Sequence, residues 1–224
     1  MSSLSAALQT SAWGGLLGEA ELQAIAAETC VKQLAPGAYV CRKGAPVDAW
    51  IGVLDGLVKM SSLSPEGKPV TFTGVPAGGW FGEGSLLKYP EPRLYDVIAV
   101  RESRVAYMPR STFNRLLDTH IGFNRFLLKQ LNERLAQFIA VIENDRLLEP
   151  DARVARALAQ LFNPLLYPGT VAFLQLSQEE IGLLSGVSRQ RANQALQVLE
   201  KAGLLMVEYG GVRVLDVEGL KRFG

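Results

Sequence analysis

Side chains that pair with nucleic-acid bases are concentrated in one short segment near the end of the 224-residue chain. Residues 187–198 contain arginine, glutamine and asparagine but no carboxylate. Arginine can pair with guanine through two hydrogen bonds, and asparagine or glutamine can pair with adenine in the same way. Serine hydroxyls and the amides at a helix N-terminus hold phosphates. The candidate contacts to DNA are Ser177, Ser188, Arg189, Gln190, Arg191, Asn193 and Gln194.

The residues around this segment predict a helix-turn-helix. Ser177, with a glutamate three residues later, has the spacing of a capping box and begins a short helix. Gly186 supplies the left-handed residue that the turn needs, and Ser188 caps a second helix. Small residues at Gly182 and Ala192 allow the two helices to cross closely. The alternative, a solvated helical hairpin, requires all of these features to coincide by chance.

Two apolar runs follow this unit, over residues 203–209 and 212–215. The pair Gly210-Gly211 lies between them and predicts a β-hairpin, which makes the domain a winged helix-turn-helix. Arg213 on the second run either contacts backbone phosphate or is simply solvated.

A second segment has the composition of an anion site. Gly82, Glu83, Gly84 and Ser85 form one run, and Arg93 follows it. Backbone amides and a guanidinium are the groups that hold an anion. The alternative is a structural turn in which Arg93 pairs with a carboxylate, for which the candidates are Glu83, Glu91 and Asp96.

The elements that would position this second segment read as strands. From about Val31 to Met108, short apolar runs are separated by glycine and proline, which predicts an antiparallel sandwich or barrel. One short helix is expected before it, over residues 19–27. The clearest predicted strands cover residues 50–54, 57–60, 70–73 and 97–100.

Residues 111–146 contain no proline and a single glycine, and their apolar residues recur at helical spacing, so they predict one long helix. An apolar stripe on this helix is typical of packing against a partner helix in a homodimer. Its residues are Ile121, Leu128, Leu131, Leu135, Phe138 and Ile142. In the alternative reading the helix packs only on its own barrel. Pro150 ends the helix because it disfavours helical geometry at Glu149.

The sequence thus predicts an α+β fold of three parts. Residues 1–110 form an N-terminal antiparallel β-barrel of the jelly-roll type, which contains the candidate anion site. Residues 111–148 form the long dimerisation helix and hinge. Residues 149–224 begin with a helix over 151–161 and contain the winged helix-turn-helix.

Several classes of protein are disfavoured by composition. A net charge of +1 produces no general attraction to nucleic acid or to an anionic membrane, so DNA binding needs a local patch. Cys30 and Cys41 cannot supply the four thiolates of an iron–sulfur cluster and are expected to be buried small hydrophobic residues. His120, the one histidine, is a poor basis for a zinc site, a haem site or histidine-dependent catalysis. We therefore expect no metal, no haem and no enzyme.

The chain also lacks the signals of a membrane or secreted protein. No stretch approaches the roughly 20 apolar residues of a spanning helix. The N-terminus has neither the basic region nor the continuous apolar region of a signal peptide. We expect a cytoplasmic protein with no membrane partner.

This arrangement resembles the cyclic-AMP receptor protein and fumarate-nitrate reductase regulator (CRP/FNR) superfamily. The resemblance covers nearly the whole chain and is strongest over Gly186–Arg191, Gly79–Leu87 and Arg93. It implies a cyclic-nucleotide-binding-like barrel and a bacterial homodimeric transcription factor on a pseudo-palindromic operator, with double-stranded DNA and RNA polymerase as partners. It also implies that Arg189 reads a guanine and that Gln190 and Gln194 are further base readers.

The resemblance implies an effector site at Gly82, Glu83, Gly84, Ser85, Arg93 and Leu94. Its ligand would be a cyclic nucleotide or another small anion. Leu94 and Tyr95 stand where cyclic-AMP-binding members have a small residue after the arginine, and Phe138 and Ile139 stand where those members have threonine and serine. These differences argue against specificity for cyclic AMP.

Two alternatives to an effector-gated regulator remain open. One is a ligand-binding or protein-interaction module whose helix-turn-helix does not engage DNA, because residues 149–224 carry eight basic and eight acidic side chains. The other is a DNA-binding protein that needs no ligand. A steep fall of DNA affinity with salt would exclude the first alternative.

Overall fold

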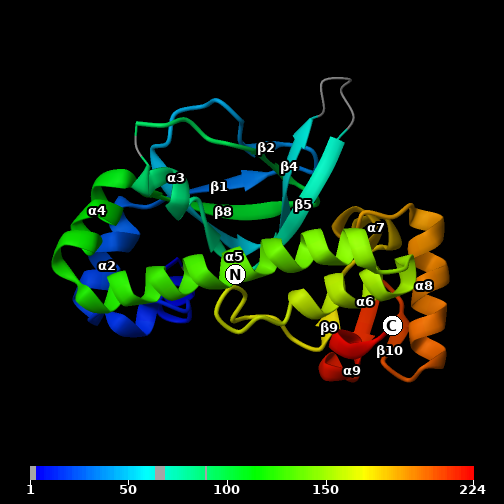
Figure 1. Cartoon of the computed structure of the whole chain (residues 1–224). Coiled ribbons are helices and arrows are strands. Elements are labelled where there is room, and N and C mark those ends of the chain that lie inside the picture. The colour runs from blue at the N-terminus through cyan, green and yellow to red at the C-terminus, as the bar shows by residue number, and fades with distance from the viewer. Residues whose placement is uncertain (1–3, 64–68, 89) are drawn as a thin grey trace.

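The computed structural model describes residues 4–63, 69–88 and 90–224 (Figure 1). The helices are α1 (Leu4–Gln9), the 3₁₀ helix η1 (Gly14–Leu16), α2 (Glu19–Glu28), α3 (Glu83–Leu87), α4 (Arg110–Thr119), α5 (Ile121–Leu147), α6 (Pro150–Gln160), α7 (Gln178–Ser185), α8 (Arg189–Lys201) and α9 (Val217–Arg222).

The strands are β1 (Cys30–Leu34), β2 (Tyr39–Cys41), β3 (Ala49–Asp55), β4 (Leu57–Leu63), β5 (Pro69–Pro76), β6 (Trp80–Phe81), β7 (Asp96–Ala99), β8 (Ser103–Pro109), β9 (Phe173–Leu174), β10 (Leu205–Glu208) and β11 (Gly211–Val214). The first eight form two four-stranded antiparallel sheets, in the orders β1-β8-β3-β6 and β2-β7-β4-β5. The remaining three form a small sheet in the order β10-β11-β9.

The two larger sheets enclose an apolar interior and confirm the predicted antiparallel barrel. Each predicted strand falls on β3, β4, β5 or β7. Alternating residues of the barrel strands point into this interior, and β3 is buried on its other face as well. The inward set includes Val40, Ile51, Val53, Val58, Met60, Val75, Phe81, Val97 and Val105.

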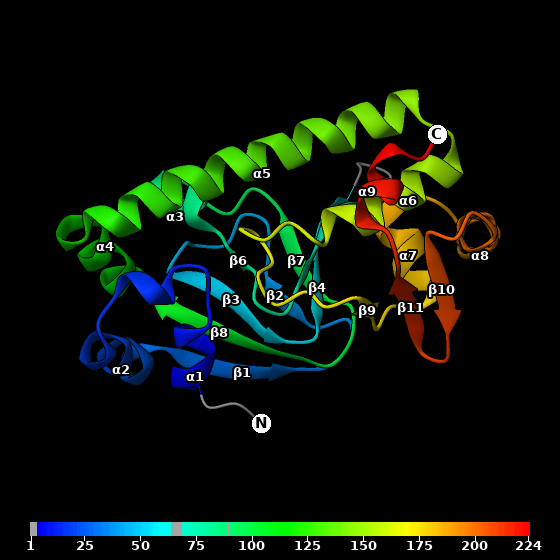
Figure 2. The ribbon, with the colours of Figure 1, turned by 90° about the horizontal axis from the view of Figure 1, so that it is seen from below.

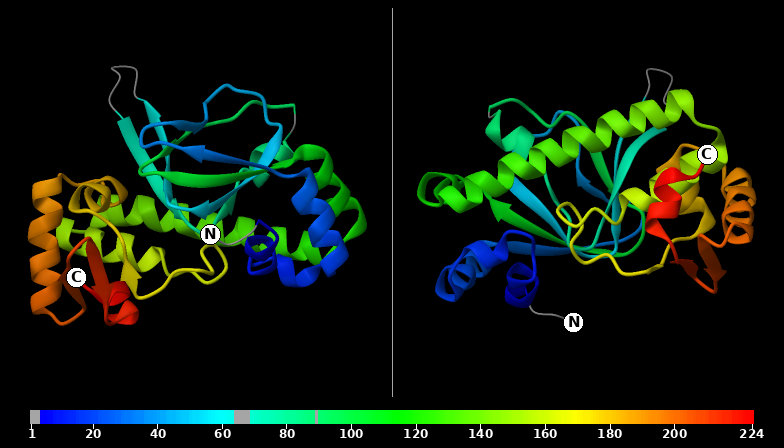
Figure 3. Two further views of the ribbon diagram at one scale, coloured as in Figure 1. Left: turned by 180° about the vertical axis from the view of Figure 1, so that it is seen from behind. Right: turned by 60° about the horizontal axis from the view of Figure 1, so that its bottom comes forward.

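All three tryptophans of the chain meet in a second core. The ring centroids of Trp50 and Trp80 lie 4.6 Å apart, and Trp13 lies 5.5 Å from Trp50 and 5.2 Å from Trp80. Phe113 of α4 and Phe123 of α5 complete the cluster. Figure 3 shows that the N-terminal helices and α4 lie at the opposite end of the barrel from the C-terminal domain. The aromatic core therefore fixes the start of α5 to the barrel.

The prediction of one continuous helix over residues 111–146 is wrong at His120, where α4 ends and α5 begins. His120 has φ −124° and ψ 99°, and its Nε2 lies 2.6 Å from Oε1 of Glu21 on α2. Nδ2 of Asn124 donates to the carbonyl oxygen of Leu117 at 2.6 Å, which satisfies a carbonyl at the end of α4. Tertiary contacts thus interrupt a segment whose local composition is helical throughout.

Helix α5 has two faces of different character. The face on the barrel buries Phe123, Phe126, Leu127, Gln130, Arg134 and Gln137. The opposite face exposes apolar residues at seven-residue spacing, with exposed fractions of 72% at Ile121, 68% at Leu128, 59% at Leu135 and 53% at Ile142. Leu131 is half-buried. Phe138, predicted for the same stripe, packs instead against the barrel core.

The C-terminal domain surrounds its own apolar core. Pro150 is the first residue of α6, and Glu149 before it is extended with φ −64° and ψ 156°. Residues of α6, α7, α8, α9 and the small sheet pack together, and Leu57 of the barrel joins the same core. Figure 2 shows α5 running along the barrel to this domain. The two halves of the chain are therefore in direct contact.

The two cysteines differ from expectation in their burial. Cys30 is exposed, because it begins β1, an edge strand whose residues are mostly open to solvent. Cys41 is half-buried against the barrel core. The prediction that both are buried is wrong for Cys30.

Candidate nucleic-acid interface and effector pocket

The predicted capping box at the start of α7 is confirmed. Oγ of Ser177 accepts a hydrogen bond from the Glu180 amide at 3.2 Å, and the Ser177 amide donates to Oε2 of Glu180 at 2.6 Å. The other carboxylate oxygen, Oε1, lies 2.8 Å from Nη2 of Arg101, which follows β7 in the barrel. Glu180 therefore both begins α7 and joins it to the barrel. Ser177 itself is exposed.

The turn between α7 and α8 is the predicted one. Gly186 has φ 66° and ψ 30°, a left-handed conformation that glycine adopts readily. A Cβ atom built on Gly182 would lie 2.8 Å from the carbonyl oxygen of Val187. The absence of a side chain at Gly182 thus lets the turn lie close against α7, as the sequence predicts.

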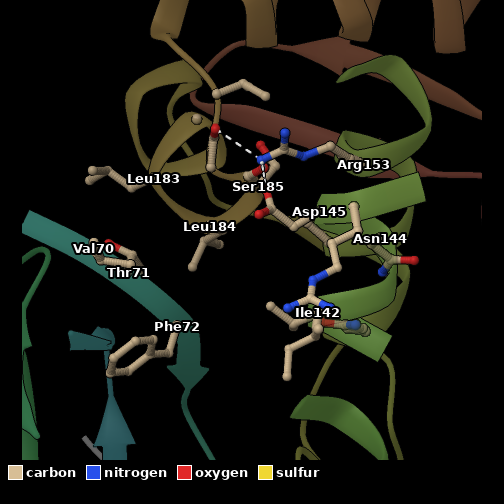
Figure 4. A pocket seen from close by; sticks show the side chains of 17 residues that line it. Val70, Thr71, Phe72, Ile142, Asn144, Asp145, Arg153, Leu183, Leu184 and Ser185 are labelled. Carbon is tan, nitrogen blue, oxygen red and sulfur yellow. Dashed lines mark hydrogen bonds and ion pairs between the residues drawn. The ribbon is translucent and has the colours of Figure 1, made fainter. Parts of the chain in front are cut away.

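Arg153 of α6 forms hydrogen bonds with the backbone of this turn. Its Nη2 donates to the carbonyl oxygens of Ser185 and Gly186 at 3.1 Å each. The same nitrogen lies 2.7 Å from Oδ1 of Asp145 near the end of α5. Figure 4 shows this arrangement at the side of a cavity of about 740 Å³ between β5, α5 and α7. One guanidinium therefore connects the long helix to the helix-turn-helix.

Helix α8 presents three of the predicted base-reading side chains to solvent. Oγ of Ser188 accepts from the Arg191 amide at 3.2 Å and caps the helix as predicted. Arg189, Gln190 and Gln194 are exposed. In Figure 1, α8 lies at the end of the molecule away from the barrel, so this face is open to a partner.

Two other predicted base readers are engaged within the domain. Nη1 of Arg191 lies 2.6 Å from Oδ1 of Asp151 at the start of α6. Oδ1 of Asn193 accepts from Nε2 of Gln178 on α7 at 3.0 Å. Both side chains are half-buried. Arg191 thus connects α8 to α6, and Asn193 connects α8 to α7. Their contacts differ from those of Arg189, Gln190 and Gln194, which face solvent.

The predicted wing is present as the β10–β11 hairpin. Arg213 pairs with Glu208 on the neighbouring strand, with Nε to Oε1 at 2.5 Å and Nη2 to Oε2 at 3.1 Å. The hydrogen bonds from Arg213 lower the pKa of Glu208. Arg213 is therefore neither free for phosphate nor merely solvated in this state.

In the effector segment, the name used here for the predicted site at Gly82–Ser85, Arg93 and Leu94, the Arg93 side chain is buried beside Gly82. Gly82 has φ 95° and precedes α3. The Arg93 side chain is 3% exposed, and its Nη2 donates to the carbonyl oxygen of Ala49 at 2.8 Å. Nη1 is buried, has no hydrogen-bond partner in the part of the chain that the structure describes, and lies 2.8 Å from a Cβ atom built on Gly82. A buried guanidinium with an unused donor is what an anion site requires.

The three carboxylates considered as partners of Arg93 are engaged elsewhere. Oε2 of Glu83 accepts from Nε1 of Trp50 at 3.3 Å, Oε2 of Glu91 lies 3.1 Å from Nζ of Lys88, and Oδ1 of Asp96 accepts from the Lys43 amide at 2.8 Å. Within the described residues none of the three forms an ion pair with Arg93, so the alternative of a carboxylate-paired turn is wrong. Among the other predicted effector residues, Ser85 is buried, whereas Gly84 and Leu94 are exposed.

Helix α5 directs three polar residues into the barrel that were not predicted from the sequence. Nη2 of Arg134 donates to the carbonyl oxygen of Trp80 at 2.8 Å, and its Nε lies 3.8 Å from Oε1 of Glu83. Gln130 donates to the same carbonyl at 3.3 Å, and Gln137 donates to Oγ1 of Thr73 at 3.2 Å. Gln130, Arg134 and Gln137 are four and three positions apart, so they lie on one face of the helix, opposite the apolar stripe. This spacing is the signal in the sequence that could have identified them.

Burial opposes the charge on Arg134, yet its surroundings keep it. Desolvation acts to lower the pKa of Arg134, but Tyr167, Glu83 and Tyr95 together hold that pKa above its ordinary value. A charged guanidinium therefore lies at the boundary between α5 and the effector segment.

Two observations bear on metals and membranes. Within residues 4–63, 69–88 and 90–224, no group of three or more histidine, cysteine, aspartate or glutamate side chains is arranged to hold a metal ion. No helix in the described part of the chain is long and apolar enough to cross a membrane.

Comparison with known proteins identifies both parts of the chain. The model of the cyclic nucleotide-binding domain matches residues 31–120, and the model of the Crp-like helix-turn-helix domain matches residues 152–223. The chain is 30% identical to a CRP-like cAMP-activated global transcriptional regulator of Mycobacterium tuberculosis, over 93% of this chain and 95% of that protein. It is 29% identical to the transcriptional regulator SdrP of Thermus thermophilus, over 79% and 84% of the two chains.

A solved structure shows the same fold. FixK2 from Bradyrhizobium japonicum superposes with a TM-score of 0.70 at 17% identity, covering 86% of this chain and 95% of that one. With a cyclic-nucleotide-binding-like barrel, a long helix and a winged helix-turn-helix in this order, the chain belongs to the CRP/FNR family of transcriptional regulators.

Proposed function

We propose that this regulator binds DNA through α8. The observation that carries the proposal is the Ser188-capped helix with Arg189, Gln190 and Gln194 exposed on one surface. A guanidinium and two carboxamides at the N-terminal end of such a helix can reach base edges in the major groove. Arg189 is assigned to a guanine.

The DNA-binding form would be a homodimer joined along α5. The exposed residues Ile121, Leu128, Leu135 and Ile142 lie seven residues apart, which is the spacing of a helix that packs on a copy of itself. Two recognition helices related by a two-fold axis would read half-sites about 34 Å apart, so the operator would be a pseudo-palindrome. Transcription control then places the protein in the cytoplasm with RNA polymerase as a partner, and it requires no catalytic activity.

The barrel would hold a small anionic effector. Residues 1–110 would then sense this effector, residues 111–148 would form the dimer, and residues 149–224 would bind DNA. Nη1 of Arg93, which is buried beside Gly82 and has no hydrogen-bond partner among the described residues, supports an anion. The M. tuberculosis relative named as cAMP-activated favours a cyclic nucleotide. The ligand would shift the equilibrium between arrangements of the two DNA-binding domains.

The test is selection of operators from random duplexes by the full-length protein, followed by fluorescence anisotropy at several salt concentrations. A pseudo-palindromic consensus and a steep fall of affinity with salt are expected, because several phosphate counterions are released. A triple substitution of Arg189, Gln190 and Gln194 to alanine, with the protein still folded, should abolish the sequence preference. The absence of any enriched sequence would favour the alternative of an interaction module.

A further inference from the structure

The loop that follows α6 enters the barrel. Its residues Leu166 and Tyr167 are 2% and 1% exposed and belong to the same apolar core as Val53 and Val75. Figure 2 shows this segment, in yellow, lying against the barrel strands on the side of α5. A segment of the DNA-binding domain thus occupies the interior of the sensing domain.

The hydroxyl of Tyr167 satisfies polar groups from two elements of the barrel wall. It donates to the carbonyl oxygen of Gly74 on β5 at 3.1 Å. It also accepts from Nε2 of Gln137 on α5 at 3.1 Å, and Nη1 of Arg134 lies 3.5 Å away. Buried polar groups are costly without partners, so the hydroxyl is an integral part of this interior.

The ring of Tyr167 lies beside the effector segment. A Cβ atom built on Gly79, three residues before Gly82, would lie 3.1 Å from Cδ1 of Tyr167. Arg134 contacts the Tyr167 hydroxyl and also lies 3.8 Å from the carboxylate of Glu83. Tyr167 therefore lies next to the segment proposed to bind the effector and is connected to it through Arg134.

Hydrogen bonds of Asn163 hold the loop at its N-terminal end, and its C-terminal end lies close against the barrel. Nδ2 of Asn163 donates to Oε2 of Glu133 on α5 at 2.8 Å, and Oδ1 of Asn163 accepts from the amides of Leu165 and Leu166 at 3.0 Å each. On the other side, a Cβ atom built on Gly78 would lie 3.3 Å from the Gly169 amide nitrogen. The loop is an ordered insertion and not a loose connection.

We propose that the loop of residues 163–170 is a tethered occupant of the effector site. Tyr167 and the effector exclude each other, and Tyr167 in its site holds the DNA-binding domain against its own barrel in a state of weak DNA binding. This inference rests on the proposed function, because it specifies how the same site is regulated. The Arg101–Glu180 ion pair adds a second contact that keeps the domain in this docked position.

The space left by Tyr167 also defines its competitor. A ligand that replaces the side chain needs a planar ring for the apolar interior. It needs a donor for the Gly74 carbonyl and an acceptor for Gln137, the two roles that the hydroxyl fills here. An anionic group on the same ligand would pair with Nη1 of Arg93, which has no hydrogen-bond partner within the described residues.

Operator affinity of ligand-free variants tests the proposal. Tyr167→Phe removes the hydroxyl, and Tyr167→Ala removes the occupant. Tyr107→Phe is the matched control, since its hydroxyl also donates to a barrel carbonyl, that of Val40 at 3.1 Å, but belongs to the barrel itself. Both Tyr167 variants should bind the selected operator more tightly, by about fivefold or more for Tyr167→Ala, a factor typical of coupled sites. Tyr107→Phe should leave the affinity unchanged.

The compound p-cresol is the side chain of tyrosine without its connection to the chain. It therefore distinguishes the effect of filling the site from the effect of connecting the occupant to the DNA-binding domain. It should raise the melting temperature of Tyr167→Ala but not that of the wild type, whose site is already full. Operator affinity of Tyr167→Ala should stay high with p-cresol bound, because the analogue is not connected to the DNA-binding domain.

Three results would overturn the proposal. They are equal operator affinities for Tyr167→Phe and Tyr107→Phe, weaker binding by both Tyr167 variants, or return of Tyr167→Ala to wild-type affinity when p-cresol binds. Failure of every protein, wild type included, to bind DNA would instead refute the proposed function.

Discussion

Leu184 of α7 packs directly on Gly74 of β5. A Cβ atom built on Gly74 would lie 2.5 Å from Cδ2 of Leu184, closer than two carbon atoms can approach. The carbonyl of the same glycine accepts the hydroxyl of Tyr167. Gly74 therefore contacts the DNA-binding domain twice. Its Cα, which carries no side chain, lies against Leu184, and its carbonyl oxygen accepts from Tyr167.

Gly74→Ala should destabilise the protein by about 1 kcal/mol, the lower end of the cost of overpacking, because the added methyl group displaces only the flexible end of the Leu184 side chain. Urea unfolding measures this change. Gly15→Ala is the control, since a Cβ atom there meets nothing within 4 Å. In a Leu184→Ala background the cost of Gly74→Ala should shrink, and an unchanged cost would place the strain elsewhere.

Arg189 and Arg191 should respond differently to substitution by alanine. Arg189→Ala is expected to weaken operator binding by about 1–3 kcal/mol and to relax one base of each half-site. Arg191 is paired with Asp151, so Arg191→Ala should cost stability, by about 1 kcal/mol or less for a partly exposed pair, and retain the base preference. Operator selection repeated with each variant distinguishes the two roles. An altered consensus for Arg191→Ala with an intact one for Arg189→Ala would reverse the assignment.

Leu135→Glu should convert the protein to monomers, because it places a charge in the middle of the exposed apolar stripe of α5. Sedimentation equilibrium measures the change. Ala136→Glu adds the same side chain at the next position, which faces another direction on the helix, and should leave the dimer intact. Dissociation by both variants, or by neither, would argue against the stripe as the interface.

A saturating effector should raise the melting temperature. At 100 times its dissociation constant a ligand adds about 2.7 kcal/mol, which raises the melting temperature of a chain of this length by roughly 5–11 °C. Cyclic AMP, cyclic GMP and cyclic di-GMP are the first ligands to compare. Arg93→Met should remove the shift, and Lys88→Met, which removes an exposed cation nearby, should not. No shift with any of the three would contradict a nucleotide effector and direct attention to other anions.

The free energy of unfolding should fall as pH rises from about 9 to about 11. Burial raises the pKa of the Cys41 thiol from 9.0 to about 11. Between these values the unfolded chain releases a proton that the folded protein retains, so alkali favours unfolding, and the contribution is fully present below pH 9. Burial likewise raises the pKa values of Tyr95 and Tyr107 to about 12, which extends the loss to higher pH.

Urea unfolding at a series of pH values tests this. Cys41→Ala should flatten the dependence between pH 9 and 11. Cys30→Ala, at an exposed thiol, should leave the slope as it is in the wild type. A slope that is insensitive to Cys41→Ala would assign the loss of stability to other groups.

The parts of the molecule that follow local rules could be predicted from the sequence. The cap at Ser177, the left-handed turn at Gly186 and the cap at Ser188 each depend on residues within four positions of one another, and all three are confirmed. The strand pattern of the barrel is local in the same sense. These features need no knowledge of distant contacts.

What could not be predicted depends on residues far apart in the chain. The break at His120 depends on Glu21, which is 99 positions away. The contacts of Arg134 and Gln137 are with residues on other elements, and Tyr167 enters the barrel 93 positions after Gly74. Composition and periodicity describe neighbours along the chain, so polar residues that meet inside the barrel leave only a weak signal.

The clustering of the tryptophans has a spectroscopic consequence. All three indoles lie within one aromatic core, and Nε1 of Trp50 donates to the carboxylate of Glu83 in the effector segment. Intrinsic emission excited at indole wavelengths therefore originates from one location instead of being averaged over the molecule. The chain carries its own fluorophore beside the effector segment, while the DNA-binding domain contributes no indole to the spectrum.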